Sequence, residues 1–288
     1  MDIESKKFLG QPKNFISIFN ALLFDGQPVL KPEYLKDENS ELVMNVSSKH
    51  VDIIKRYEDG TYLDLFVIES QSYVDQCMVA RVMEYECVAR MRYIRQNFKK
   101  HVPMHTRLPM ILTVVLYVGE SKWNAAKRLS ELEIIHPGFE DMFNEFKLNL
   151  IELNTNHKYN TGEKATQDFF DLLRMIYRKQ ILKENLDREF NRDALYFAYV
   201  VTKNKELLNI YQESEKGDVK VCRALDEMFE ESTNKGIQMG IKQGIEQGIA
   251  LNQFEVYQTM LDKGFSVKAI ASIFSVSKES IKTLLMKA

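Results

Sequence analysis

Runs of apolar residues divide the chain into a first part with several strand patterns and a second part that is almost entirely helical. Met44–Tyr57 and Thr61–Gln71 have the β-branched and aromatic content of strands, and the Asp-Gly pair between them is a strong hairpin signal. The continuous apolar stretch Met110–Val118 predicts a central strand that is buried on both faces. Phe146–Asn154 predicts one further strand.

Helical patterns lie on both sides of these strands in the sequence. Asn14–Phe24 has the apolar spacing of an amphipathic helix, and Asp75–Phe98 is long and contains neither Gly nor Pro. From Lys164 onward nearly every segment has helical spacing. This order predicts an α/β fold, a mixed β-sheet flanked by helices, with a helical C-terminal region.

A glycine repeat marks the C-terminal region. The stretch "KGIQMGIKQGIEQGIA" carries Gly at positions 236, 240, 244 and 248. Each Gly costs about 1 kcal/mol relative to Ala inside a helix, so the segment is a poor isolated helix. Two interpretations stay open: a marginal linker helix, or a smooth stripe on which a second copy packs to form a homodimer.

The last segment, "LDKGFSVKAIASIFSVSKESIKTLL", predicts two short amphipathic helices with Ser277 as the N-cap of the second. This is the shape of a helix-turn-helix. The second helix offers only Lys278 and Lys282 to DNA, and no Arg, Asn or Gln that could contact base edges. DNA binding and packing against a partner are therefore both retained as interpretations.

Composition narrows the class of protein. The 288 residues carry a formal net charge of −2 with a pI near 6.3, which excludes a globally basic DNA-binding protein but leaves room for a local basic face. The longest apolar run is too short to span a bilayer, and the charged N-terminus lacks the apolar stretch of a signal peptide. We therefore expect a soluble cytoplasmic protein that does not contact a membrane.

The hairpin brings acidic residues together. If Asp-Gly forms a two-residue turn, Glu58 pairs with Thr61. Asp52, Glu69 and Gln71 then share one face, and the diagonal between the two acids is about 7–8 Å. Two carboxylates at that separation suit Mg²⁺, which prefers oxygen ligands and can activate a water for attack on a phosphate.

An interpretation without a metal is also open. Asp52 and Glu69 could lie at the end of the sheet and pair with Lys55 or Arg56. The same register sets Lys55 opposite Asp64 on the other face, where the two would form a structural ion pair.

A cationic stripe follows on the long helix. Its members recur at a spacing of four and three residues and are Arg81, Tyr85, Val88, Arg92, Arg95 and Lys99. Such a stripe beside an acidic site suits the phosphates of double-stranded DNA, although a solvated face has the same pattern.

The stretch "HVDIIKRYEDGTYLDLFVIESQS" resembles the core of the PD-(D/E)XK nuclease superfamily, with Gln71 where the motif usually has lysine. That variant is typical of the recombination-promoting nuclease (Rpn-like) and putative transposase branch. The stretches "FNALLFDGQPVLKPEYL", "MVARVMEYE" and "LPMILTVVLYVGESKW" agree with this resemblance, as does the Gly-Ile repeat. The similarity is strongest over residues 14–155.

The resemblance implies a restriction-endonuclease-like fold and Mg²⁺-dependent DNA cleavage. Asp52 and Glu69 would be metal ligands, and Gln71 would orient the attacking water or a phosphate oxygen. The resemblance also implies an acidic residue in many relatives where this chain has Ser17. Its absence would weaken metal binding, and Glu84 and Asp25 are the candidates to substitute for it.

Four segments are predicted: a nuclease-like domain over 1–185, a helical extension over 186–235, a Gly-Ile linker helix over 236–250 and a small helix-turn-helix-like segment over 251–288. The predicted function is a metal-dependent DNA endonuclease associated with recombination or mobile elements. The alternative is a catalytically degenerate protein that keeps the nuclease fold and acts as a DNA- or protein-interaction module.

Overall fold

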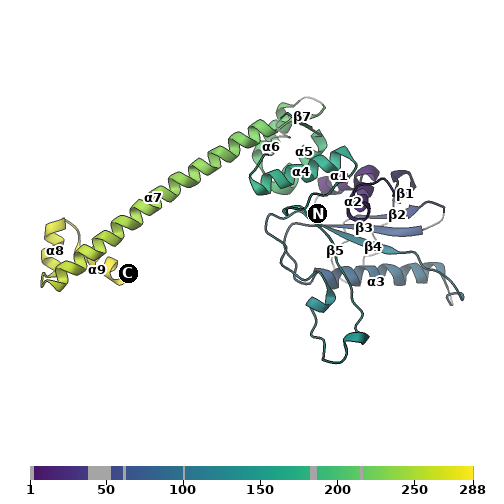
Figure 1. Ribbon diagram of the computed structural model, residues 1–288, viewed down its shortest axis with the longest axis horizontal. Helices are drawn as coiled ribbons and strands as arrows, with labels where there is room; N and C mark the ends of the chain where they lie inside the picture. The colour runs from purple at the N-terminus through teal and green to yellow at the C-terminus, as the bar shows by residue number, and fades with distance from the viewer. Residues whose placement is uncertain are drawn as a thin grey trace. The chain divides into compact units, whose positions relative to one another are not determined.

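The computed structural model describes residues 3–37, 53–60, 63–99, 101–181, 187–214 and 217–287 (Figure 1). Its contacts divide the chain into two compact units, Met1–Asp226 and Glu227–Ala288. The predicted boundaries at 185, 235 and 250 remain predictions. Among the described residues, no helix is both long enough and apolar enough to cross a membrane.

A five-stranded sheet forms the centre of the first unit. Its strands, in spatial order, are β1 (Leu35–Asp37), β2 (Ile53–Glu58), β3 (Leu63–Gln71), β4 (Ile111–Tyr117) and β5 (Asn149–Glu152). The pairs β1–β2 and β2–β3 are antiparallel, and the pairs β3–β4 and β4–β5 are parallel. The sheet is therefore mixed, and the predicted α/β nuclease-like fold class is confirmed.

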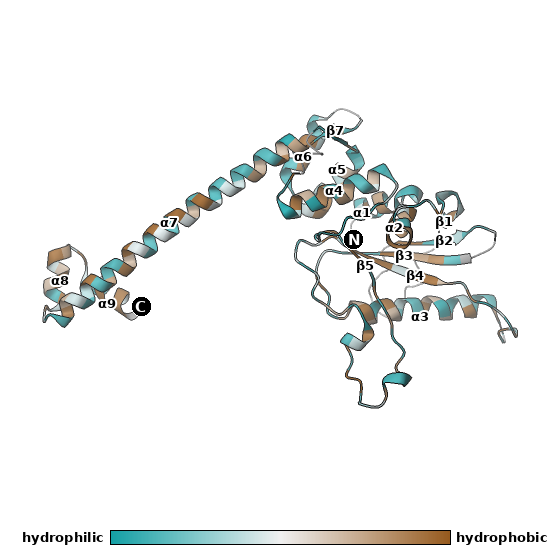
Figure 2. Cartoon of the chain, viewed as in Figure 1, coloured by the Kyte–Doolittle hydropathy of each residue, from teal (hydrophilic) through white to brown (hydrophobic). Residues whose placement is uncertain are grey.

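Helices cover both faces of this sheet (Figure 1). On one face α3 (Met78–Asn97) packs Val79 and Val82 against Val115 of β4. On the other face α2 (Pro12–Phe24) stacks Phe19 on Phe66 of β3, with ring centroids 4.7 Å apart. Figure 2 shows how apolar β3 and β4 are, as expected of strands buried on both faces.

Further helices and a two-stranded sheet complete the first unit. They are α1 (Ile3–Leu9), α4 (Lys164–Arg178), α5 (Arg192–Thr202) and α6 (Lys205–Glu213), together with β6 (Glu189–Phe190) and β7 (Val219–Lys220). Phe169 of α4 and Phe197 of α5 stack with centroids 4.4 Å apart and join these helices in one apolar core.

The predicted register of the hairpin is wrong by two residues. Glu58 pairs with Leu63, so four residues and not two connect β2 to β3. An Asp-Gly pair signals that a turn exists but does not fix the loop length, and four-residue hairpin loops are also common. Because the slip is an even number of residues, each side chain keeps its predicted face.

This register also corrects the predicted Lys55–Asp64 ion pair. Lys55 lies opposite Phe66, and its Nζ is 2.6 Å from Oδ1 of Asp37 on β1. Asp64 instead accepts a hydrogen bond from the Met110 backbone N–H at 3.1 Å. Each residue therefore ties its strand to a different neighbour.

The second unit is a small helical domain. The helix α7 (Cys222–Asp262) is followed by α8 (Val267–Phe274) and α9 (Lys278–Lys287), and Tyr257, Ile270 and Ile281 form its core. Ser277 Oγ accepts a hydrogen bond from the Ser280 N–H at 3.0 Å, which confirms the predicted cap. Two short helices with a tight connection thus follow the long helix, as the sequence predicts.

Candidate functional site

Glu69 and Gln71 occupy the carboxyl end of β3 and point to the face covered by α3. They pair with Val115 and Tyr117 of β4, which belong to the apolar cluster under α3. Both side chains are buried, with exposed fractions of 4% and 5%. In sheets with parallel strands, ligands usually bind outside the carboxyl ends, so this edge is where a site is expected.

An arginine of α3 lies directly over Glu69. Nη2 of Arg81 is 3.2 Å from Oε1 of Glu69, and its Nη1 donates to Oδ2 of Asp75. Nε and Nη2 also donate to the Tyr85 hydroxyl oxygen, at 3.2 and 2.9 Å. We name Glu69, Asp75, Arg81 and Tyr85 the Arg81 cluster.

The electrostatics of the Arg81 cluster keep the guanidinium charged. Burial alone lowers the pKa of Arg81, but hydrogen bonds to Asp75 and Tyr85 and the charge of Glu69 outweigh it, so the pKa is raised. Burial raises the pKa of the Tyr85 hydroxyl, and Glu69 adds to that rise. Tyr85 is therefore a neutral anchor at neutral pH, and Arg81 is a permanent cation.

Gln71 has an unmet hydrogen-bond donor. Its buried Nε2 has no hydrogen-bond partner among the residues that the structure describes. A buried amide group without a partner costs about 1–3 kcal/mol, so such groups are rare unless a ligand or water completes them. The amide is thus available to a water or a phosphate oxygen at the end of β3.

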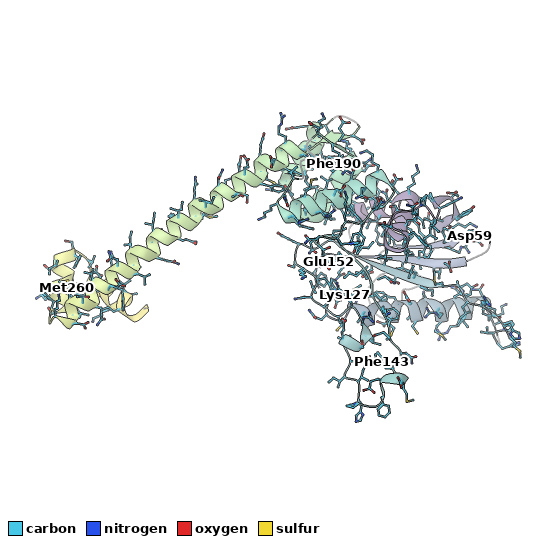
Figure 3. All side chains as sticks on the ribbon, viewed as in Figure 1. Asp59, Lys127, Phe143, Glu152, Phe190 and Met260 are labelled. Atoms are coloured by element: carbon cyan, nitrogen blue, oxygen red, sulfur yellow. The ribbon has the colours of Figure 1, made fainter. Side chains whose placement is uncertain are left out.

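A further buried carboxylate, Glu152, lies in the same row of the sheet, where it pairs with Tyr117. Its Oε1 accepts a hydrogen bond from the Trp123 N–H at 2.7 Å, and its Oε2 is 3.5 Å from Nζ of Lys127. Figure 3 labels Glu152 and Lys127. These bonds fix the loop after β4, so Glu152 has a structural task.

The other predicted acidic positions are not gathered at this edge. Asp52 lies outside the described residues and directly precedes Ile53, the first residue of β2. Ser17 of α2 donates to Thr166 Oγ1 of α4 at 2.9 Å and supplies no carboxylate. Glu84 is exposed on α3, and Asp25 is exposed at the end of α2.

The predicted cationic stripe changes character along α3. Arg81 belongs to the site, and Tyr85 packs with Leu65 and Ile111 in the core. Arg95, near the end of the helix, is exposed, and Arg92 is partly buried. Lys99 is exposed too, but α3 ends at Asn97, so Lys99 lies beyond the helix and the predicted stripe is too long. The spacing does put the helical residues on one face, but the first half of that face turns toward the sheet.

The donor atoms fit a hard divalent cation best when a second carboxylate joins Glu69. Among the described ranges, no three His, Cys, Asp or Glu side chains come together to hold a metal ion. Mg²⁺ usually keeps several waters and needs only one or two carboxylates, and the buried Gln71 amide can bond such a water. Glu69 with one more acid therefore matches Mg²⁺ chemistry.

A family model described as "Putative transposase, YhgA-like" matches residues 29–206. The match covers more than half of the 288 residues and includes the sheet, α3 and the Arg81 cluster. The chain belongs to this family. The family is of the Rpn/PD-(D/E)XK type, which confirms the resemblance of the sequence. A search of curated proteins found no match to the chain, and neither did a search of solved structures.

Membership of the YhgA-like family indicates a function associated with mobile elements.

Sequence reasoning missed Asp75, which holds Arg81 and also accepts a hydrogen bond from the Cys77 N–H at 2.9 Å. The only signal was an Asp at the start of a predicted helix, six residues before an Arg. Glu86 was missed too, although its spacing from Val82 and Ala89 places it on the buried face of α3.

Proposed function

We propose that the protein is a metal-dependent DNA endonuclease that hydrolyses phosphodiester bonds. The observation that carries the proposal is the pair Glu69 and Gln71, buried side by side on one face of β3 under the Arg81 guanidinium. Family membership supports the same chemistry, since the family is of the PD-(D/E)XK type.

Asp52 is proposed as the second carboxylate. The sequence pattern of the hairpin predicts Asp52 on the same face as Glu69, and Asp52 directly precedes Ile53, the residue that pairs with Ile68. Two such acids supply the ligands that one Mg²⁺ ion needs.

Other side chains of the site are assigned the remaining roles in the reaction. When bound, Mg²⁺ would lower the pKa of a water and neutralise charge on the scissile phosphate. The Gln71 amide can donate to the attacking water or to a phosphate oxygen, but it carries no charge. Arg81 supplies the positive charge that the lysine of the usual motif would bring. The exposed Arg95 of α3 and Lys99, just beyond the end of that helix, contact further DNA phosphates.

A plasmid-nicking assay in the presence of Mg²⁺ tests the proposal. Glu69→Gln removes a charge at nearly constant volume and should abolish cleavage while leaving the fold and DNA binding intact. Asp52→Ala should do the same. Glu84→Gln is the matched control, because Glu84 is an exposed carboxylate on α3 and its variant should cleave normally. Cleavage that persists in Glu69→Gln would place the catalytic carboxylates elsewhere.

One set of observations favours a second candidate, a nuclease-fold protein that has lost catalysis and acts as an interaction module. Ser17, at the position where the resemblance implies an acid in many relatives, donates a hydrogen bond to Thr166, and Arg81 already pairs with Glu69. Under this function the wild-type chain binds DNA or protein, and no divalent ion produces cleavage in the same assay.

The protein is further proposed to associate as a homodimer through α7. Four isoleucines, each more than half exposed, follow the glycines of the repeat: Ile237, Ile241, Ile245 and Ile249. A Cβ added at any of the four glycines would meet nothing within 4 Å. Rows with four-residue spacing favour helix crossings near −50°, and small residues let the two backbones approach closely.

A two-fold axis beside Gly244 would set Gly240 of one chain against Gly248 of the other. By sedimentation at micromolar concentration, Gly240→Leu combined with Gly248→Leu should shift the dimer to monomer, because the added side chains prevent the close approach of the two helices. Lys242→Glu is the control, since Lys242 lies on the face of α7 opposite Gly244 and its variant should stay dimeric. A monomeric wild-type chain would refute the dimer.

A further inference from the structure

Arg81 differs from the other cations of α3 in what surrounds it. Its side chain is 17% exposed, whereas Arg95, and Lys99 just beyond the helix, are open to solvent. Its guanidinium contacts two carboxylates and one hydroxyl: Glu69, Asp75 and Tyr85. A residue held in this way is not a mobile cation that waits for a DNA phosphate.

The anchors of Arg81 are themselves fixed. Tyr85 is buried in the core between α3 and the sheet, and the Arg81 Cζ lies 5.7 Å from the centroid of its ring. Asp75 accepts a hydrogen bond from the Cys77 backbone N–H just before α3 begins. The guanidinium is therefore held above Glu69 from the helix side, independently of any ligand.

This placement affects how the edge of the sheet binds cations. Glu69 is the described carboxylate that a divalent ion would need, and a permanent positive charge lies 3.2 Å from its Oε1. Like charges in a partly buried site repel strongly because the local dielectric is low. A divalent ion must therefore compete with Arg81 for Glu69, unless another anion joins Glu69 and Asp75 in the site.

We propose that Arg81 is a positioning residue that keeps the affinity of Glu69 for divalent cations low until a DNA phosphate enters the site. The phosphate supplies the negative charge that the cation and the guanidinium then share. Metal binding and DNA binding are thereby coupled, and each raises the affinity for the other by the same factor. This inference rests on the proposed nuclease function of the same site.

Mn²⁺ titration by isothermal calorimetry tests the coupling with the full chain. The titration is done with and without a short DNA duplex whose phosphorothioate linkages resist cleavage. Without DNA, Arg81→Gln should bind Mn²⁺ about tenfold more tightly than wild type, because the repelling charge is gone. The duplex should tighten Mn²⁺ binding about tenfold in wild type and change it far less in the variant.

Three further variants complete the test. Arg90→Gln removes another cation of the same helix, whose side chain is 43% exposed, and should leave Mn²⁺ binding without DNA unchanged. Glu69→Gln should abolish the binding in every background, which assigns the measured ion to this site. Tyr85→Phe keeps both charges, removes one anchor of Arg81 and should give an intermediate Mn²⁺ affinity, so the test survives if Arg81→Gln folds poorly.

The outcomes separate this inference from the proposed function. Mn²⁺ binding that is unchanged or weaker in Arg81→Gln, or undetectable in both proteins, overturns the coupling even if plasmid cleavage depends on Glu69. Conversely, if the chain shows the expected Mn²⁺ coupling but never cleaves DNA, the inference about Arg81 holds and the proposed nuclease function is refuted.

Discussion

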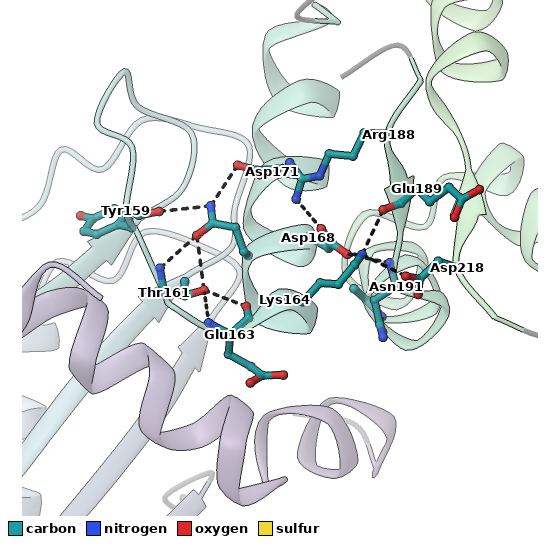
Figure 4. Close-up of polar contacts among 12 residues, drawn as sticks. Tyr159, Thr161, Glu163, Lys164, Asp168, Asp171, Arg188, Glu189, Asn191 and Asp218 are labelled. Atoms are coloured by element: carbon teal, nitrogen blue, oxygen red, sulfur yellow. Dashed lines mark hydrogen bonds and ion pairs between the residues drawn. The ribbon is translucent and has the colours of Figure 1, made fainter. Parts of the chain in front are cut away.

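Among the described residues of the first unit, two clusters bring one arginine together with two carboxylates. One is the Arg81 cluster at the end of β3. The other lies on α4 and comprises Lys164, Asp168, Asp171 and Arg188, which we name the Asp168 cluster (Figure 4). Both arginines have a raised pKa, because hydrogen bonds to the acids outweigh the effect of burial. Their settings nevertheless differ.

In the Asp168 cluster the carboxylates are satisfied by groups of the protein itself. Asp168 is fully buried and accepts hydrogen bonds from Lys164 Nζ at 2.7 Å, from the Asn191 N–H at 2.7 Å and from Arg188. Nη1 of Arg188 is 2.6 Å from Oδ2 of Asp171. These bonds attach the segment before α5 to α4, so the cluster serves the fold.

The Arg81 cluster has an unmet group beside it. The Gln71 Nε2 is buried, and no described residue accepts a hydrogen bond from it. Fully satisfied polar networks hold a structure together, whereas partly satisfied ones are costly and mark the positions where a ligand completes the set. A buried acid–arginine pair therefore does not by itself identify a functional site. The unmet amide of Gln71 beside the Arg81 cluster is what distinguishes the two.

The largest effect that separates the two clusters concerns stability. Asp168→Ala leaves Lys164 and Arg188 without a shared, buried partner and should lower the free energy of unfolding by about 3–5 kcal/mol. Glu69→Gln should lower it by only about 1 kcal/mol, because Arg81 keeps Asp75 and Tyr85 and the amide oxygen still accepts. Urea unfolding monitored by circular dichroism measures both.

Asp168→Asn provides the second variant if Asp168→Ala does not fold, and it should lie between the other two in stability. If Asp168→Asn and Glu69→Gln lowered the free energy of unfolding equally, the Arg81 cluster would also serve the fold and would not differ from the Asp168 cluster.

A smaller effect contrasts two glutamines. Gln167 Nε2 donates to Tyr159 O and to Asp171 Oδ1, both at 3.2 Å, whereas Gln71 Nε2 has no acceptor among the described residues. Gln167→Met should therefore destabilise the chain by about 1–3 kcal/mol, since buried acceptors lose their donor. Gln71→Met should be neutral or stabilising by about 1 kcal/mol, because it removes an unmet donor, and it should impair cleavage. A destabilising Gln71→Met would show that Gln71 is already satisfied.

Much of the fold follows from the sequence because its signals are local. The continuous apolar run of β4 and the uninterrupted helical spacing of α3 each specify their element without help from the rest of the chain. The hairpin register did not follow, because an Asp-Gly pair fixes neither the loop length nor the partner of Lys55. That partner, Asp37, lies 18 residues away in the sequence.

Only part of the candidate site could be predicted from the sequence. Alternation along β3 suffices to place Glu69 and Gln71 on one face. The position of Arg81 over Glu69 depends on how α3 packs on the sheet, and the spacing that groups Arg81 with Arg95 cannot show which end of that face is buried. Asp75 was overlooked for the same reason, since its partner is defined by tertiary structure and not by pattern.

The smallest expected effect concerns Glu86, another buried acid, which lies on α3. The protein pairs its carboxylate less fully than that of Asp168. Its Oε1 accepts a hydrogen bond from the Thr113 N–H at 3.0 Å, and Arg90 is 4.0 Å from its Oε2. Burial is the largest influence on Glu86, and its pKa lies above the ordinary value of 4.5 even though Thr113 and Arg90 act to lower it. The folded chain therefore holds this proton more tightly than the unfolded chain does.

The sign of the pH dependence follows from that shift. The raised pKa of Glu86 adds stability below the ordinary carboxyl range, and this contribution is lost as the pH rises through the raised value. Glu86→Gln keeps the acceptor for Thr113 and does not titrate. Relative to wild type, the stability of Glu86→Gln should rise by up to about 1 kcal/mol between pH 4 and pH 7. Thermal unfolding across that range measures the difference in stability. If the wild type instead became more stable relative to Glu86→Gln as the pH rises, Arg90 would neutralise Glu86 as fully as Arg188 neutralises Asp168.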